Sequence, residues 1–170
     1  MCAEREIKQG EEICIRYIPF NELSEDRLSN LQNVLKKSWK FNCPLECECH
    51  KEEHVERLNK SRSIYAEINT LIAHGDPSDK GIKLVEDLLK EQELFHASSV
   101  DKQGTHYNGY RLALAKKDWK LAKDYLEKVN EVLVTIFPPA SKELLKIGKE
   151  MDDLKQNLSS GSGSGPSGSS

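Results

Sequence analysis

Apolar residues recur every three to four positions through most of the chain, from residue 53 to residue 158. This spacing places them on one side of a helix and predicts amphipathic helices that bury that side. The run His74-Gly75-Asp76-Pro77 separates the first two helices, because Gly and Pro interrupt a helix. The first apolar face contains Val55, Leu58, Tyr65, Ile68 and Ile72, and the second contains Ile82, Val85, Leu88, Leu89 and Phe95.

Three further helices follow. We predict the third near residues 107 to 115 and the fourth after Asp118, whose side chain caps its first turn. The fourth ends at Phe137-Pro138-Pro139, because proline cannot continue a helix, and the fifth begins at Ser141. Five helices with short connections predict a mainly α bundle of antiparallel pairs. The expected faces are Ala122, Tyr125, Val129, Val132, Leu133 and Ile136 in the fourth helix, and Leu144, Gly148, Met151 and Leu154 in the fifth.

Residues 4 to 18 carry the chain's one convincing alternation of period two, which predicts a β-strand after a turn at Gly10. Apolar residues occupy both of its faces, so the strand requires neighbours on either side. No other segment predicts a strand, and a lone strand is unstable in water. We therefore expect the rest of the sheet to lie outside this chain.

Residues 24 to 39 predict a helix before the bundle, with Ser24 as its N-cap and Lys36 and Lys37 matching the dipole at its end. At the other end of the chain, residues 159 to 170 consist of Ser, Gly and one Pro. Such a composition buries no apolar surface and predicts a flexible linker or tag.

Charged residues make up 31% of the chain, but the net charge is only −3. A protein that binds the phosphate backbone normally carries a basic excess, so we expect no direct contact with nucleic acid. The sequence also lacks a long apolar run and a signal peptide, so we expect no membrane contact. These patterns predict a cytoplasmic and/or nuclear protein.

Three of the five cysteines, Cys43, Cys47 and Cys49, lie within seven residues. In an intracellular chain, clustered cysteines favour a zinc site over a disulfide, although free structural thiols are an alternative. His50 is a candidate fourth ligand, but adjacent residues such as Cys49 and His50 rarely reach one metal ion. We expect the remaining histidines to be solvated or to cap helices: His54, His74, His96 and His106.

The predicted strand and the segment that follows it together resemble a known family. The residues that carry the resemblance are Arg5-Glu-Ile-Lys-Gln-Gly-Glu-Glu-Ile-Cys-Ile-Arg-Tyr17, Glu25-Asp-Arg27, Leu31 and Trp39-Lys-Phe41-Asn-Cys43. They resemble the end of a SET domain that runs into its cysteine-rich post-SET segment. The resemblance is to lysine methyltransferases of the SET-and-MYND subfamily and their fungal relatives. The helices resemble that subfamily's tetratricopeptide-like C-terminal region, with Ala115-Lys-Lys-Asp-Trp-Lys-Leu-Ala122 similar to one repeat.

The resemblance implies four parts: the end of a SET domain (1–23), a post-SET helix and cysteine segment (24–52), a helical C-terminal domain (53–158) and a Gly/Ser tail (159–170). The expected fold is therefore mainly α, a helical, tetratricopeptide-like bundle preceded by a short SET-derived strand and a post-SET cysteine segment.

The resemblance also implies roles for individual residues. Tyr17 matches the catalytic tyrosine, whose hydroxyl orients the substrate amine for attack on the methyl group of S-adenosylmethionine. Phe41 matches the aromatic residue that packs on the cofactor's adenine. Cys43, Cys47 and Cys49 match the zinc ligands, whose fourth partner comes from the catalytic core, although their C-x3-C-x-C spacing differs from the family's C-x-C-x-x-C.

The family's Gly-x-Gly cofactor loop and Asn-His pair do not occur in this sequence. We therefore predict a fragment of a protein-lysine N-methyltransferase that is inactive alone, with the missing SET core expected elsewhere. Its partner is a protein or peptide substrate, for example a histone or chaperone tail. The alternative is a non-catalytic helical interaction module that binds a peptide on a concave surface.

Overall fold

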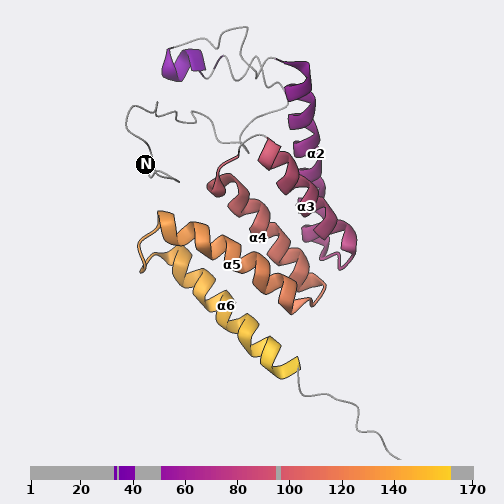
Figure 1. Ribbon diagram of the computed structural model, residues 1–170, viewed down its shortest axis with the longest axis vertical. Coiled ribbons are helices and arrows are strands. Elements are labelled where there is room, and N and C mark those ends of the chain that lie inside the picture. Colours follow the sequence, from indigo (N-terminus) through magenta and orange to yellow (C-terminus); the bar gives the residue numbers. More distant parts are fainter. Residues whose placement is uncertain (1–32, 34, 41–50, 95–96, 162–170) are drawn as a thin grey trace, which may run out of the picture.

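The computed structural model describes residues 33, 35–40, 51–94 and 97–161, and helices dominate these ranges (Figure 1). No β-strand occurs within them, which confirms the mainly α prediction. The predicted strand, most of the helix predicted at 24 to 39, and Phe95 lie outside the described residues. The helices are η2 (Leu35–Trp39), α2 (Glu52–His74), α3 (Asp79–Leu94), α4 (Ser99–Ala115), α5 (Trp119–Ile136) and α6 (Lys142–Gly161).

The predicted break between the first two helices is confirmed. Gly75 ends α2 in the left-handed conformation, at φ 62°, and its N–H donates to the carbonyl of Ile72 at 3.1 Å. Glycine suits this position because it has no Cβ to clash there. Asp76 then accepts a hydrogen bond from the backbone N–H of Ser78 at 2.7 Å, which shapes the turn into α3.

The third helix begins earlier than predicted, at Ser99 rather than near Tyr107. Its start is fixed by a capping box: the N–H of Asp101 donates to Ser98 Oγ at 3.2 Å, and the N–H of Ser98 donates to Asp101 Oδ2 at 3.1 Å. Apolar periodicity missed this half of α4 because its buried positions include the polar Thr105.

The last two helices begin where the sequence predicted. Asp118 caps α5 by accepting from the N–H of Leu121 at 3.0 Å, and α6 begins after Ser141, whose hydroxyl accepts from the N–H of Leu144 at 3.3 Å. However, α6 continues to Gly161, so the start of the predicted linker is helical. In this last part of the helix the Ser159 hydroxyl donates to the Gln156 carbonyl oxygen at 2.8 Å.

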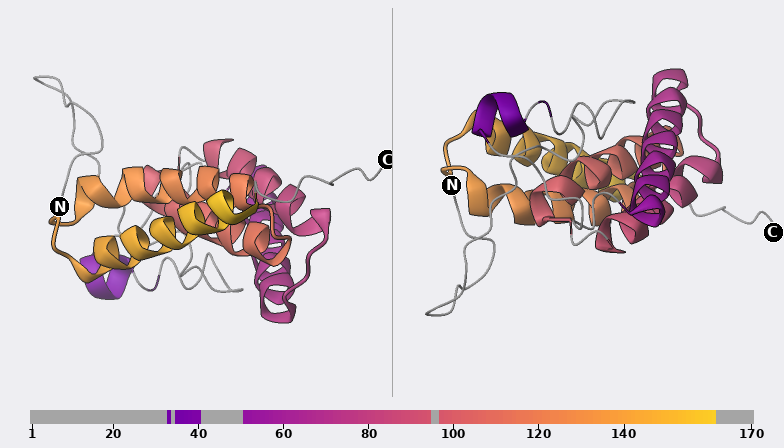
Figure 2. Two further views of the ribbon diagram at one scale, coloured as in Figure 1. Left: turned by 90° about the horizontal axis from the view of Figure 1, so that it is seen from below. Right: turned by 90° about the horizontal axis from the view of Figure 1, so that it is seen from above.

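Each helix from α2 to α6 packs against the next one along the chain, and α2 also contacts α4 (Figures 1 and 2). The short turns reverse the chain direction between neighbours, which confirms the predicted stacking of consecutive pairs. None of the described helices is both long and apolar enough to cross a membrane.

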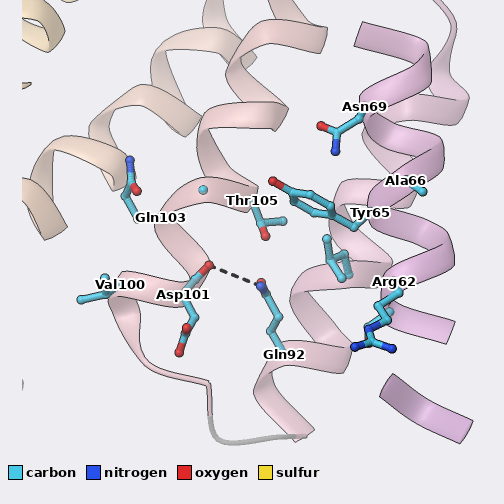
Figure 3. Close-up of a pocket in the computed structure, with 12 residues that line it drawn as sticks. Arg62, Tyr65, Ala66, Asn69, Gln92, Val100, Asp101, Gln103 and Thr105 are labelled. Carbon is cyan, nitrogen blue, oxygen red and sulfur yellow. Dashed lines mark hydrogen bonds between the residues drawn. The ribbon is translucent and has the colours of Figure 1, made fainter. Parts of the chain in front are cut away.

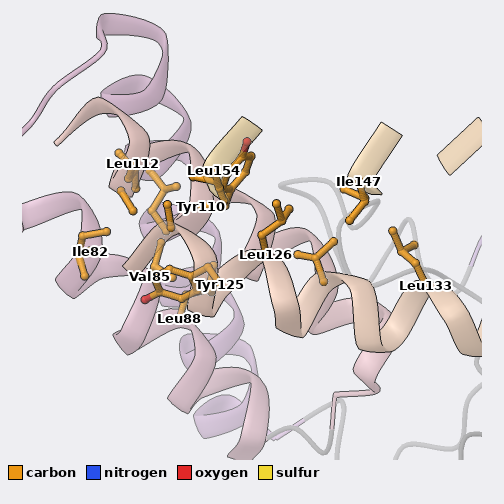
Figure 4. Packing of buried hydrophobic residues seen from close by; sticks show 14 of the residues in the cluster. Ile82, Val85, Leu88, Tyr110, Leu112, Tyr125, Leu126, Leu133, Ile147 and Leu154 are labelled. Carbon is orange, nitrogen blue, oxygen red and sulfur yellow. The ribbon is translucent and has the colours of Figure 1, made fainter. Parts of the chain in front are cut away.

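One apolar core runs through all five helices, and Figure 4 shows much of it. On α6 the predicted Leu154 is buried, and Leu144 and Met151 pack partly buried against the core. Gly148 is exposed, however, and its neighbour Ile147 is buried instead. The helices α4 and α5 approach closely at Gly109, where an added Cβ would lie 2.8 Å from the ring of Tyr125. The most deeply buried side chains include Ile68, Val85, Leu88, Leu112, Leu126 and Val129.

Candidate binding pocket

A pocket of about 490 Å³ lies between α2, the end of α3 and the first half of α4 (Figure 3). One wall comes from α2, between Ser61 and Asn69, and the other from α4, between Val100 and Thr105. Leu88 and Gln92 of α3 complete the lining. Its volume lies in the range of pockets that hold small molecules or side chains of a partner.

Two features keep the pocket open. Gly104 of α4 has no side chain, and no described atom lies within 4 Å of the place where its Cβ would be. Tyr65 of α2, expected on the core face, lines the pocket instead and remains 39% exposed. Part of the Tyr65 side chain therefore stays available for contact.

Two side chains of the lining carry a buried polar atom without a hydrogen-bond partner. The hydroxyl of Ser61 and the amide oxygen of Gln92 find no hydrogen-bond partner among the described residues, although these residues are only 1% and 3% exposed. Buried polar groups in proteins are nearly always hydrogen-bonded. Both atoms are themselves buried beneath the lining, so they lie behind the surface that a ligand would touch.

The orientation of the Gln92 amide follows from its neighbour. The nitrogen Nε2 donates to the backbone carbonyl of Asp101 at 3.4 Å, drawn as a dashed line in Figure 3. A carbonyl can only accept, so the nitrogen must face it and the amide oxygen must face elsewhere. The amide oxygen is therefore the end of the Gln92 side chain without a partner, and it is buried.

Ion pairs and caps around the pocket hold its three helices together. Lys60 of α2 and Glu91 of α3 form an ion pair at 2.5 Å, and Lys102 of α4 lies 3.8 Å from Glu93. The capping box at Asp101 fixes the first turn of α4. The pocket walls are therefore connected by contacts that do not depend on a ligand.

His106, on α4 beyond the pocket, contradicts the expectation that it is solvated or capping. It is half-buried, and its ring centroid lies 6.1 Å from that of Tyr125. Burial, with smaller contributions from Lys128 and Lys102, lowers the pKa of His106 from 6.5 to about 4. The imidazole is therefore neutral at neutral pH.

This burial predicts a pH-dependent stability. The pKa of His106 is about 4 in the folded chain and 6.5 in the unfolded chain. The contribution of this histidine to the free energy of unfolding is therefore complete above pH 6.5 and is lost as the pH falls towards 4. We expect about 2 kcal/mol less stability at pH 5 than at pH 7.5 from this group. Urea unfolding at pH 5 and at pH 7.5 measures this difference in the free energy of unfolding.

The variant His106→Gln should lack the loss of stability between pH 7.5 and pH 5 that comes from His106. His74→Gln, on an exposed histidine at the end of α2, is the matched control and should keep it. The same pH dependence in His106→Gln and the unmodified chain would show that His106 does not titrate between the two states.

The residues that the sequence singled out lie outside the described residues: Tyr17, Phe41, Cys43, Cys47 and Cys49. Among the residues that are described, no three His, Cys, Asp or Glu side chains are arranged to hold a metal ion. The sequence patterns did not predict the pocket. One signal was present, because Ser61 interrupts the apolar stripe between Leu58 and Tyr65.

No protein-family model, curated protein or solved structure matches this chain. The resemblance of residues 4 to 50 to a SET domain stays a prediction.

Proposed function

We propose that the helical region is an interaction module that binds a peptide segment in the pocket between α2, α3 and α4. The observation that supports this most is the pocket itself, which has a volume of about 490 Å³ and is lined by residues of three helices.

The mixed lining favours a peptide over a purely apolar ligand. Tyr65 and Val100 provide apolar surface beside the polar side chains of Asn69 and Gln103. Val100 is 47% exposed, so apolar surface continues outside the pocket. A peptide matches this combination, because one side chain can enter the pocket while its neighbours lie on the rim. Stacked helix pairs commonly hold peptides in this way.

Filling the pocket should abolish binding. Gly104→Trp places an indole where no described atom lies within 4 Å of the Cβ position, so we expect a folded protein with a blocked pocket. The probe is a pool of random hexapeptides with blocked ends, added to ¹⁵N-labelled protein. Saturable shifts of the Gln92 side-chain amide should occur in the unmodified chain and disappear in Gly104→Trp.

Gly148→Trp is the matched control, because Gly148 lies on α6 and its Cβ position is equally open. It should behave like the unmodified chain. The absence of any shift in the unmodified chain, or equal shifts in Gly104→Trp, would rule out the pocket as a peptide site.

The sequence of residues 4 to 50 favours a second function. We propose that this segment belongs to an S-adenosylmethionine-dependent protein-lysine methyltransferase. Two stretches support this proposal: residues 10 to 17 resemble the end of a SET domain, and residues 39 to 43 resemble the start of its post-SET segment. In this proposal Tyr17 aligns the substrate amine and Phe41 packs on the adenine. The helical region, which resembles the subfamily's tetratricopeptide-like region, then forms a lid over the substrate cleft.

Metal content and cofactor binding test this second proposal. Cys43, Cys47 and Cys49 offer three thiolates, a donor set that zinc prefers. We expect elemental analysis to find one zinc ion per chain, and Cys47→Ser to reduce it, whereas Cys14→Ser should not. Calorimetry should detect no binding of S-adenosylmethionine, since the family's cofactor loop does not occur in the sequence.

Stoichiometric cofactor binding would overturn the prediction that the chain is inactive alone. Neither zinc nor cofactor on the purified protein would remove the support for the methyltransferase proposal and leave the interaction module.

A further inference from the structure

We infer that the pocket between α2, α3 and α4 is an anchor site for an aromatic side chain of the bound peptide, that of Phe, Tyr or Trp. This inference rests on the proposed peptide-binding function and names the side chain that enters the pocket.

Only part of the lining has surface that a ligand can touch. The accessible surface includes the exposed side chains of Tyr65 and Ala66 on α2 and of Val100 on α4, all of which are apolar or carry an apolar ring. A ligand therefore meets apolar groups on both walls of the pocket. The buried residues behind this surface are at most 3% exposed: Ser61, Leu88, Gln92 and Thr105.

The two walls suit a flat ring. The Tyr65 side chain extends from α2 into the space between α2 and α4 (Figure 3) and is 39% exposed. On α4, Gly104 presents backbone without a side chain, and no described atom lies within 4 Å of its Cβ position. An aromatic ring in this space can pair with the ring of Tyr65, and such pairs gain free energy beyond that of the area they bury.

Val100 extends the apolar surface of the pocket. Its side chain is 47% exposed, although burial stabilises large apolar side chains. A ring bound in the pocket can remove surface of both Tyr65 and Val100 from water, together with its own. The pocket volume of about 490 Å³ is sufficient for the largest side chains, because pockets of this size hold whole small molecules.

The charged residues of the lining favour neither an acidic nor a basic side chain. Arg62 and Asp101 contribute one charge of each sign. The Asp101 carboxylate already accepts hydrogen bonds from Ser98, through the backbone N–H at 3.1 Å and the hydroxyl at 2.8 Å. A charged side chain would therefore lose hydration on entering the pocket and meet one like and one opposite charge. A neutral ring avoids this penalty.

The polar side chains of the accessible surface suit the peptide backbone. Asn69 of α2 is exposed and Gln103 of α4 is half-buried. Each ends in a carboxamide, which both donates and accepts hydrogen bonds. A peptide backbone offers N–H and C=O groups at nearly every residue, so these amides can bind it whatever its sequence. The apolar surface is then the part of the pocket that selects a side chain.

The test uses five hexapeptide libraries with identically blocked ends, in which the third residue is fixed as Phe, Leu, Gln, Glu or Lys. The other positions contain only Gly, Ala, Ser and Thr. Each library is titrated into the ¹⁵N-labelled full chain while the backbone amide of Gly104 is followed. We expect the Phe library to bind with a dissociation constant at least about 10-fold lower than the Gln, Glu and Lys libraries, and about 3-fold lower than the Leu library.

Val100→Ser tests the apolar surface of the pocket. Val100 is exposed in the first turn of α4, so serine there should leave the melting temperature nearly unchanged. The Phe library should bind about 5-fold more weakly to this variant. Val134→Ser is the matched control, because Val134 of α5 is 54% exposed and lies outside the lining. It should bind the Phe library as the unmodified chain does.

Tyr65→Leu tests the pairing of rings. This variant keeps an apolar side chain on the α2 wall but removes the aromatic ring, so the Phe and Leu libraries should bind it equally well. Tyr65→Phe retains the ring and should keep the preference for the Phe library.

The outcomes separate this inference from the function on which it rests. Binding of the Leu, Gln, Glu or Lys library as tightly as the Phe library would overturn the aromatic anchor and keep the peptide module. Equal binding of the Phe library to Val100→Ser and the unmodified chain, or an unchanged preference for Phe in Tyr65→Leu, would also overturn it. So would the absence of shifts with all five libraries, and if the random hexapeptides also gave none, both proposals would be wrong.

Discussion

Gly109→Val should lower the free energy of unfolding by about 3 kcal/mol or more. An added Cβ at this position would lie 2.8 Å from two carbon atoms of the Tyr125 ring. The ring has little freedom to move, because Tyr125 is buried and belongs to the same core cluster as Val85 and Leu88 (Figure 4). Relief of the clash therefore requires α4 and α5 to separate, which exposes core on both helices.

Gly104→Val, five residues earlier on the same helix, is the matched control. It introduces the same β-branched side chain, but no described atom lies within 4 Å of its Cβ position. Urea unfolding or calorimetry compares the two, and Gly109→Val should melt roughly 10 °C or more below the control. Equal melting temperatures would show that α4 and α5 do not pack through Gly109.

Leu126→Ala is the second large effect, with an expected loss of about 3 kcal/mol. Leu126 lies on α5, has no exposed surface, and belongs to the core cluster with Leu133 and Ile147 (Figure 4). Truncation removes apolar area from the core and leaves a cavity that the surrounding helices fill only in part. The smaller side chain therefore weakens the packing that holds α5 in the bundle.

Leu145→Ala provides the comparison, since Leu145 of α6 is 63% exposed. The same change of side chain should alter the free energy of unfolding there by less than about 0.5 kcal/mol. Denaturant unfolding of both variants checks the difference. A similar loss at Leu145 would indicate that this exposed side chain is covered in solution, and a small loss at Leu126 would contradict the described core.

The sequence predicted the elements whose signals are local. His74-Gly75-Asp76-Pro77 marks the turn between α2 and α3, and Asp118 marks the start of α5. Prolines 138 and 139 mark the end of that helix. Each signal acts through its own backbone geometry or a hydrogen bond to a residue three positions away, so the rest of the fold is not needed to recognise it.

The sequence did not predict the positions that depend on contacts between helices. The first half of α4 carries few apolar residues, and its start depends on a capping box that apolar periodicity does not detect. On α6, Leu154 is buried as predicted, but Gly148 is exposed and its neighbour Ile147 is buried instead. His106 was expected to be solvated or to cap a helix, whereas it is half-buried and its ring lies near that of Tyr125 on α5.

The candidate site shows the same division. The sequence by itself determined where α2, α3 and α5 form and most of the apolar residues that supply the core, because these follow from local periodicity and capping. Only the tertiary structure decided that Tyr65 faces a pocket and that Ser61 and Gln92 are buried with unpartnered atoms. These properties depend on how three helices meet, and residues 61 and 92 are far apart along the chain.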